Sequence, residues 1–395
     1  MEVRNPLRLL LLTILFLITI RTAQIQAGGE ERRPSSSSAS TGSTMSNKPI
    51  CDCDTPDPWI LAANGKFYFT FTLGNRVEIW ASSQLENFHG CQKAVVWQPA
   101  PGSPWSEDVW APELHQLNGK WYIYTCAAPP GVGNPGHRTL VLESDKKDPM
   151  DPAGWKFLGP LKGMPDHWSI DATAFSTDGH DLYLCWSGWP PGDHSDKQQN
   201  LFVARMASPV EVVPDTAVCV CHADQPWERP DDGSRGVAEG PTWVNFPGFR
   251  GIVYSAYGSW TSEYKLGLLA LVGKDPLRPE SWSKRPAPLL VSDKDHGGPF
   301  GPGHASFLPS PYNDGRLFCV YHGTANYGEG WGNRKARVLS MGPEMFAPNA
   351  APTCCHCANG LPGAGGGGGP SRRRQVLDKA PPQVQGFIGK VKKYF

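Results

Sequence analysis

Five ionisable side chains stand at the same point of a pattern that the sequence repeats five times. Each lies six to twelve residues before a turn glycine, and each turn glycine opens an aromatic-rich or apolar segment. Taken singly, an Asp beside Pro or a Glu-Gly-Pro is typical of an ordinary turn. Their common phase instead predicts a functional set. The five side chains are Asp57, Glu113, Asp171, Glu239 and His304.

Carboxyl groups gathered in one pocket cannot all ionise freely. Burial and mutual repulsion raise the pKa of one group while that of another stays low, so that the two serve as an acid and a base. Hydrolysis of a glycosidic bond requires such a pair, because the acid protonates the leaving oxygen while a carboxylate acts on the opposite side of the sugar. The residue types therefore indicate acid–base hydrolysis if the fold brings them together.

A repeated pair of strands supplies the elements that would bring these side chains together. A second apolar segment, such as VEIWAS or TLVLES, follows each aromatic one. Self-similarity at this period, with few helix signals, predicts an all-β fold, a five-bladed β-propeller. A β-sandwich would not repeat one hairpin five times. In a propeller the strand before the first hairpin is innermost, so the five side chains would converge on one mouth of the central channel. The turn glycines, 54 to 72 residues apart, are Gly65, Gly119, Gly179, Gly251 and Gly315.

The composition agrees with an all-β protein and argues against binding to nucleic acid. The 395 residues include 15 Trp, 44 Gly and 39 Pro, a mixture typical of short strands joined by tight turns. Basic and acidic residues balance at 37 each, so charge gives no reason to expect nucleic acid or an anionic membrane as partner. Cys126, Cys185 and Cys319 lie in apolar runs and are expected to be buried. Whether a disulfide joins Cys51 to Cys53, or Cys219 to Cys221, stays an open question.

Both ends of the chain differ in composition from its middle. Residues 1–27 combine arginines with an apolar run that ends at Ile20, which predicts a secretory signal peptide and an extracellular protein. A signal anchor is the alternative. Residues 28–48 are Ser- and Gly-rich and predict a disordered linker, and residues 346–395 predict a disordered low-complexity tail. We therefore expect the propeller over residues 49–345, in a monomer without a membrane segment.

The order and spacing of the motifs resemble glycoside hydrolase family 43 over about residues 52–341. Within the family the chain is most similar to fungal α-L-arabinofuranosidases and exo-acting arabinanases. The resemblance implies inversion at the anomeric carbon, three essential carboxyl groups, and release of L-arabinofuranosyl residues from plant cell-wall arabinan or arabinoxylan. The matching motifs are Asp57-Pro58, Trp110-Ala111-Pro112, Ile170-Asp171-Ala172, Glu239-Gly240-Pro241 and Gly301-Pro302-Gly303-His304.

The resemblance also implies roles for the three carboxyl groups. Asp57 is expected to be the general base that activates water, and Glu239 the general acid that protonates the leaving oxygen. Asp171 is expected to raise the pKa of Glu239 and to orient it. Inverting enzymes hold acid and base roughly 6.5–9.5 Å apart, so we expect Asp57 and Glu239 to stand at such a distance.

Three further residues are expected near the carboxyl groups. His304 resembles the central histidine that in many members lies near a metal ion, often calcium, through water; no organic cofactor is implied. Arg337 resembles the basic residue that helps to hold the Asp171-type carboxylate and is a candidate for substrate binding. Trp110 is expected either to form a wall of the sugar pocket or to pack between blades.

Two alternatives to an arabinofuranosidase remain open. One is a β-xylosidase or xylanase of the same family, because loops rather than motifs distinguish the sugars; the loops around His194 and at 328–333 are candidates. The other is a non-catalytic sugar-binding propeller. The sequence also departs from the family after Met341, where Cys354-Cys355-His356-Cys357 precedes a glycine run. These ligands are too crowded for one tetrahedral zinc site, and the departure leaves closure of the fifth blade in question.

Overall fold

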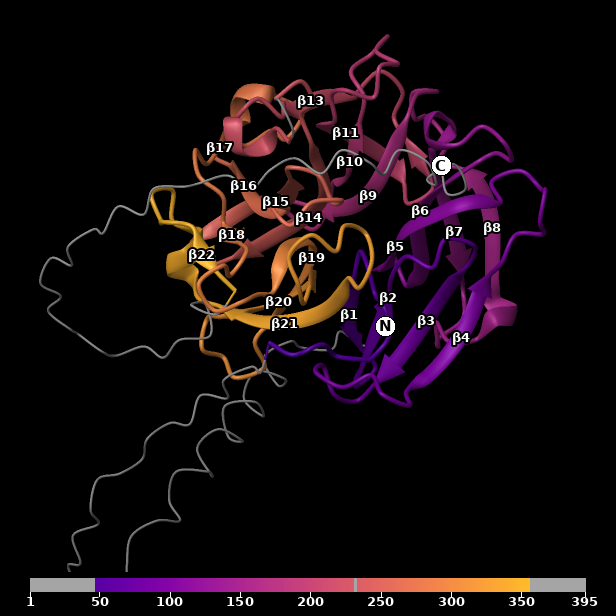
Figure 1. Cartoon of the computed structure of the whole chain (residues 1–395). Helices are drawn as coiled ribbons and strands as arrows, with labels where there is room; N and C mark the ends of the chain where they lie inside the picture. The colour runs from indigo at the N-terminus through magenta and orange to yellow at the C-terminus, as the bar shows by residue number, and fades with distance from the viewer. Residues whose placement is uncertain (1–46, 231–232, 356–395) are drawn as a thin grey trace, which may run out of the picture. The chain divides into compact units, whose positions relative to one another are not determined.

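A computed structural model describes residues 47–230 and 233–355, and its strands form five sheets arranged as a β-propeller (Figure 1). The predicted fold class is confirmed. Within the described residues the only helical elements are short 3-10 turns, and none is long and apolar enough to span a membrane. The turns are η1 (Asn134–Gly136), η2 (Pro152–Gly154), η3 (Pro226–Glu228), η4 (Pro279–Ser281) and η5 (Pro343–Phe346).

Blades 1 and 2 are four-stranded antiparallel sheets whose strands follow sequence order. Each opens with a two-residue hairpin, Asn64-Gly65 or Asn118-Gly119, in which both residues have positive φ. Such a turn matches the twist of the strands, which explains why the turn glycine recurs. Blade 1 contains β1 (Trp59–Ala63), β2 (Lys66–Thr70), β3 (Val77–Ser82) and β4 (Gln92–Trp97). Blade 2 contains β5 (Glu107–Leu117), β6 (Lys120–Ala128), β7 (Arg138–Ser144) and β8 (Trp155–Pro160).

The other three blades depart from the four-stranded pattern only at their outer edges. Blade 3 contains β9 (Ser169–Ser176), β10 (Leu182–Gly188), β11 (Asn200–Ser208), β12 (Glu211–Val212) and β13 (Val218–Cys221). Blade 4 contains β14 (Ala238–Phe246), β15 (Phe249–Ala256), β16 (Lys265–Leu271), β17 (Trp282–Lys284), β18 (Leu290–Val291) and β22 (Thr353–Cys354). Blade 5 contains β19 (Phe300–Pro309), β20 (Leu317–Thr324) and β21 (Lys335–Met341).

Apolar side chains fill the spaces between neighbouring blades rather than one central core. Five large buried clusters correspond to the five junctions of the ring, from blades 1 and 2 round to blades 5 and 1. Cys126, Cys185 and Cys319 are completely buried, as predicted. Burial of so much apolar surface between sheets is the main favourable term that holds each blade against the next.

The N-terminal segment of the described chain closes the ring. Blade 5 has only three strands of its own, and Pro49 bridges to Arg337 while the Ile50 N–H donates to the Ala336 carbonyl (2.9 Å) along β21. Asn47 accepts a hydrogen bond from the Tyr321 hydroxyl (2.6 Å). The closure that the divergent C-terminal sequence left in question is therefore made by the other end of the described chain.

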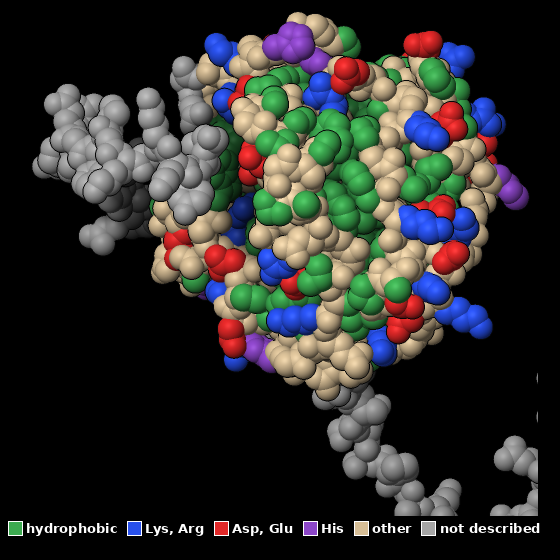
Figure 2. Space-filling model, turned by 90° about the vertical axis from the view of Figure 1, so that its right-hand side faces the viewer, with side chains coloured by type: hydrophobic (Ala, Val, Ile, Leu, Met, Phe, Trp, Pro, Cys, Tyr) green, Lys and Arg blue, Asp and Glu red, His purple; other side chains and the backbone are tan. Residues whose placement is uncertain are grey.

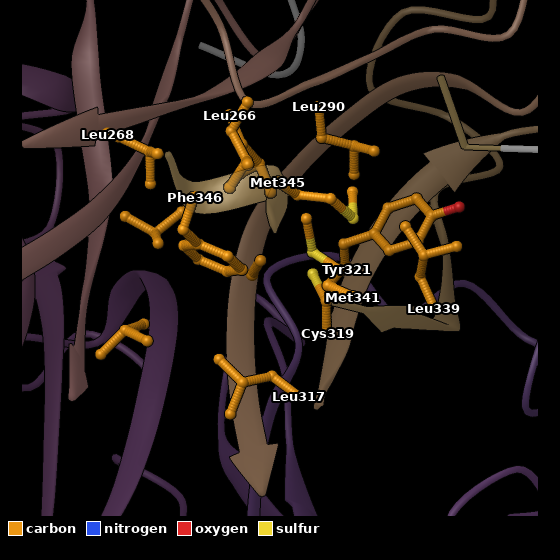
Figure 3. Packing of buried hydrophobic residues seen from close by; sticks show 14 of the residues in the cluster. Leu266, Leu268, Leu290, Leu317, Cys319, Tyr321, Leu339, Met341, Met345 and Phe346 are labelled. Atoms are coloured by element: carbon orange, nitrogen blue, oxygen red, sulfur yellow. The ribbon is translucent and has the colours of Figure 1, made fainter. Parts of the chain in front are cut away.

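The C-terminal segment is ordered further than predicted. Figure 3 shows Met345 and Phe346 packed among side chains of β16, β20 and β21. Cys355 is completely buried, and β22 pairs with β18. The predicted boundary at residue 345 is thus ten residues short of the last described residue. The predicted signal peptide (1–27), nearly all of the linker (28–48) and the tail from residue 356 lie outside the described residues.

The outer strands of blades 1 and 2 are partly open to solvent. Figure 2 faces the side on which β4 and β8 lie and shows apolar side chains gathered between charges of both signs. Val95 of β4 and Phe157 and Leu158 of β8 are exposed apolar residues. The rings of Trp97 and Phe157 stack with centroids 4.7 Å apart, which joins the outer edges of the two blades.

We predict that Ile50→Ala destabilises the protein strongly, because Ile50 is 1% exposed at the junction that closes the ring. Removal of such a side chain from a packed core lowers the free energy of unfolding by about 2–5 kcal/mol. Urea denaturation followed by tryptophan fluorescence measures the change. Val95→Ala, at an exposed position of β4, is the matched control and should lie within roughly 0.5 kcal/mol of the wild type. Equal effects of the two substitutions would contradict the closure.

Candidate active site

Each inner strand departs from regular β geometry at a residue at or near its start, and β5 and β19 contain a second such residue, Asp108 and Gly301. The backbone at these residues is left-handed, with φ between 44° and 59°. In blades 2 to 5 the strand register also shifts at this point, as in a β-bulge. Bulges bend a strand and change the direction of the side chains that follow. The five residues that recur, one in each blade, are Asp57, Ala111, Asp171, Gly240 and His304.

Hydrogen bonds from the preceding blade hold four of these left-handed residues, with blade 5 preceding blade 1. Left-handed backbone costs about 1–3 kcal/mol for a non-glycine residue, so it persists only where its surroundings fix it. Space favours glycine at position 240 as well, since a Cβ there would make a tight contact of 3.1 Å with the ring of His304. The N–H donors and their acceptors are Asp57 to His322 Nδ1 (3.0 Å), Ala111 to Thr72 Oγ1 (2.7 Å), Gly240 to Asp171 Oδ2 (2.9 Å) and His304 to Ser255 Oγ (2.7 Å).

A pocket of about 750 Å³ opens among the first residues of the inner strands and is lined from all five blades. Of the residues singled out in the sequence, Asp57, Trp110, Asp171, Glu239 and His304 line it. Asp171 and Glu239 are only 4% and 7% exposed, so their carboxyl groups are largely removed from water. The structure thus brings the three candidate catalytic carboxyl groups together.

Glu113 does not line this pocket. In blade 2 the left-handed residues are Asp108 and Ala111, and Glu113 lies two positions beyond the second of them. It is buried, with Oε2 2.9 Å from His115 Nε2. The repeat therefore predicted four of its five ionisable residues at the pocket, and the bulge position explains the exception.

Asp57 is held as an ionised carboxylate. Burial alone would raise its pKa, but the Arg334 guanidinium, His304, His322 and the Thr72 hydroxyl together lower the pKa to about 2. Arg334 Nη1 lies 3.4 Å from Asp57 Oδ1, and Thr72 Oγ1 donates to Oδ2 (2.7 Å). A carboxylate that stays charged at every ordinary pH is suited to accept a proton from water.

The pKa values of Asp171 and Glu239 are raised, in contrast to that of Asp57. Burial is the main cause that raises the pKa of Glu239 to about 7; the charge of Asp57 adds to it, and a hydrogen bond from Tyr264 opposes it. Burial, followed by the charge of Glu239, raises the pKa of Asp171 well above its usual range. Asp171 also accepts the N–H of Gly240, the residue next to Glu239, and so fixes the backbone that carries Glu239. One pocket therefore contains a charged carboxylate and a protonated carboxyl group.

Among the described residues, the side chains around His304 do not form a metal site by themselves. Its Nδ1 lies 3.3 Å from Asp57 Oδ1, and burial lowers the pKa of the ring, with the charge of Arg334 acting in the same direction. Calcium takes six to eight oxygen ligands, and His304 belongs to no group of three ligating side chains among the described residues. The one such group there is Asp293, His296 and Cys354, and Cys354 is disulfide-bonded. Calcium near His304, held through water, stays a prediction.

Arg334, and not Arg337, is the arginine of this motif that lines the pocket; Arg235 lines it from another loop. We expected Arg337 to hold a catalytic carboxylate, but it does not line the pocket and instead donates to the Asn47 carbonyl (2.8 Å) at the ring closure. Both arginines belong to the Arg334-Lys-Ala-Arg337 segment, and β21 begins between them, at Lys335. The motif therefore indicated the correct segment of the chain, but the arginine that lines the pocket stands three residues before the one that was predicted.

Trp110 has both of the predicted positions at once. It lines the pocket and stacks within blade 2 on His137, with ring centroids 3.9 Å apart. It also packs against a buried cluster that includes Trp168 and Ile170 of blade 3. Other lining residues carried no signal in the sequence repeat: Thr72, Asp196, Arg235, Trp260 and Trp331 lie in loops between strands.

Comparison with known proteins agrees with this geometry. α-L-Arabinofuranosidase B of Pyricularia oryzae is 33% identical over 273 residues, which cover 67% of this chain and 54% of that protein. An extracellular exo-α-(1→5)-L-arabinofuranosidase of Streptomyces chartreusis is 31% identical over 263 residues, 66% of this chain and 76% of that protein. The chain thus spans about half the length of the fungal relative.

Solved structures give the same picture. The crystal structure of an α-L-arabinofuranosidase from Lactobacillus brevis superposes with a TM-score of 0.65 and 31% identity, over 72% of this chain and 90% of that one. The family model described as glycosyl hydrolases family 43 matches residues 46–344, which include every pocket residue named above. The chain belongs to glycosyl hydrolases family 43.

Proposed function

We propose that this protein is a secreted glycoside hydrolase that releases L-arabinofuranosyl residues from plant cell-wall arabinan or arabinoxylan, with inversion. The observation that carries the proposal is the difference in proton affinity within one pocket: a pKa of about 2 for Asp57 and about 7 for Glu239. Two relatives are named as α-L-arabinofuranosidases, one of them as extracellular, and these names support the proposed sugar and location.

The proposed reaction uses each carboxyl group once. The Asp57 carboxylate takes a proton from a water molecule, and the water oxygen forms a bond to the anomeric carbon. The bond from that carbon to the leaving oxygen breaks, and Glu239 gives its proton to that oxygen. Asp171 holds the backbone of the acid through the Gly240 N–H. The high pKa of the acid comes mainly from burial, and the charge of Asp57 adds to it. The products are free arabinose and a shortened chain, with all protons accounted for.

We predict that Glu239→Gln and Asp57→Asn each lower arabinose release from α-(1→5)-arabinotriose by roughly 10²–10⁴-fold or more, because each removes a proton-transfer group. Released arabinose is measured by chromatography, with arabinoxylan and xylan as parallel substrates, and proton NMR gives the first anomer formed. Glu211→Gln, an exposed carboxyl of β12, is the control and should retain wild-type turnover. Wild-type turnover in either pocket variant would remove that residue from the mechanism, and release of xylose alone would reject the arabinose assignment.

The pH dependence should have an alkaline limb and no acidic limb within the stable range. Glu239 must be protonated and Asp57 ionised, so kcat/KM on arabinotriose should fall above about pH 7 and stay level down to about pH 4. With α-L-arabinofuranosyl fluoride the alkaline limb should weaken, because departing fluoride needs no proton. A limb of equal size with both substrates would show that the group titrating near pH 7 is not the acid.

We predict that Asp171→Asn stabilises the protein while it reduces activity. The folded-state pKa of Asp171 is raised above the unfolded value, so stability is lost as the pH rises toward the folded pKa. Removal of the charge should raise the melting temperature by roughly 2–4 °C at pH 8, and by less at pH 5. Calorimetry measures both values, and Asp215→Asn, an exposed turn residue, is the control. A lower melting temperature at pH 8 would contradict the strained carboxyl pair.

A further inference from the structure

An exposed tryptophan stands beside the candidate catalytic carboxyl groups. Trp331 lies in the loop between β20 and β21 and lines the same pocket as Asp57 and Glu239. Its indole is 46% exposed, whereas Trp168, which also lines the pocket, is 2% exposed. A pocket-lining ring with this much open surface is available to a ligand in a way that the buried tryptophan is not.

The loop that carries Trp331 is held in place by polar contacts. The carboxylate of Glu329 accepts hydrogen bonds from the backbone N–H and the side-chain amide of Asn326 and from the side-chain amide of Asn333. The Gly328 N–H donates to Ser262 Oγ (2.7 Å) in the neighbouring blade. Little conformational entropy remains to be lost when a ligand meets such a loop, which favours binding.

The ring itself is also oriented. Trp331 Nε1 donates to Ser259 Oγ (3.1 Å), and the ring meets that of Trp260 edge to face, with centroids 6.2 Å apart. Trp260 in turn packs under the Arg235 guanidinium at 5.3 Å. Ser259 and Trp260 belong to the loop between β15 and β16, in the blade whose inner strand carries Glu239. The exposed ring is therefore supported from the blade of the proposed acid.

One arginine connects this ring to the proposed base. Arg334 Nε donates to the Trp331 carbonyl (3.0 Å), and Arg334 Nη1 lies 3.4 Å from Asp57 Oδ1. The position of the tryptophan is thus fixed relative to the reacting groups through a single rigid guanidinium.

We propose that Trp331 is the platform for the sugar residue on the leaving-group side, the second unit of a linear arabino-oligosaccharide. The inference rests on the proposed function. The apolar C–H face of a sugar ring packs on an indole. The leaving sugar must emerge beside Glu239, and Trp331 lines the same pocket and is held by Ser259 and Trp260 from the blade of Glu239. Binding energy gained there acts on the rate only with substrates that possess such a sugar.

The test compares two substrates that share the arabinofuranosyl group. α-(1→5)-L-Arabinotriose has a leaving sugar, and α-L-arabinofuranosyl fluoride has none. We expect Trp331→Ala to lower the ratio of kcat/KM for the triose to kcat/KM for the fluoride by roughly 10- to 100-fold. Trp331→Phe, which retains a ring, should recover part of the ratio.

The matched control is Tyr327→Ala. Tyr327 is an aromatic residue of the same loop, 62% exposed, that does not line the pocket, so its removal should leave the ratio at the wild-type value. An unchanged ratio in Trp331→Ala, or the same fall in Tyr327→Ala, would overturn the inference while leaving the hydrolase intact. A wild-type protein that cleaves neither substrate would reject the proposed function, and the platform with it.

Discussion

The geometry of the site depends on a left-handed residue at or near the start of every inner strand. Four of the five are fastened by a hydrogen bond from the blade before, so the direction of the first inner side chains is set by the contact between two blades. The apolar clusters at the five junctions supply the free energy that keeps those contacts in register. Packing between sheets thus determines where the reacting groups lie.

The contacts between blades also give the carboxyl groups of the pocket different proton affinities. Asp57 receives its partners from blade 5, where Arg334, His304 and His322 converge, and these groups favour its charged form. Asp171 and Glu239 come from blades 3 and 4, where burial is the main cause that raises the pKa of both, and the charge of Glu239 raises that of Asp171 further. Two carboxyl environments that differ this much within one pocket follow from which blades meet, and local sequence alone does not specify them.

The sequence sufficed for the fold and for much of the pocket. Recurring turn glycines predicted five blades because a tight hairpin reversal favours glycine, as in Asn64-Gly65. The prediction was wrong in blade 4, where Gly248 is the turn glycine and Gly251 lies within β15. Asp57, Asp171 and Glu239 followed from their shared phase with those turns. The bulge position was not visible, which is why Glu113 was misplaced. Arg334 was missed in favour of Arg337, because its contact joins residues 277 positions apart and no local pattern records it.

The fastening of Asn47 to the last blade has a consequence for how the protein is made. Tyr321 and Arg337 reach it from 274 and 290 residues further along the chain. During synthesis the segment around Asn47 therefore cannot make these contacts until nearly all of the remaining strands have left the ribosome. Completion of the circle is the most non-local event in its assembly, the kind of step that is slow and exposes unfinished edges to misassociation.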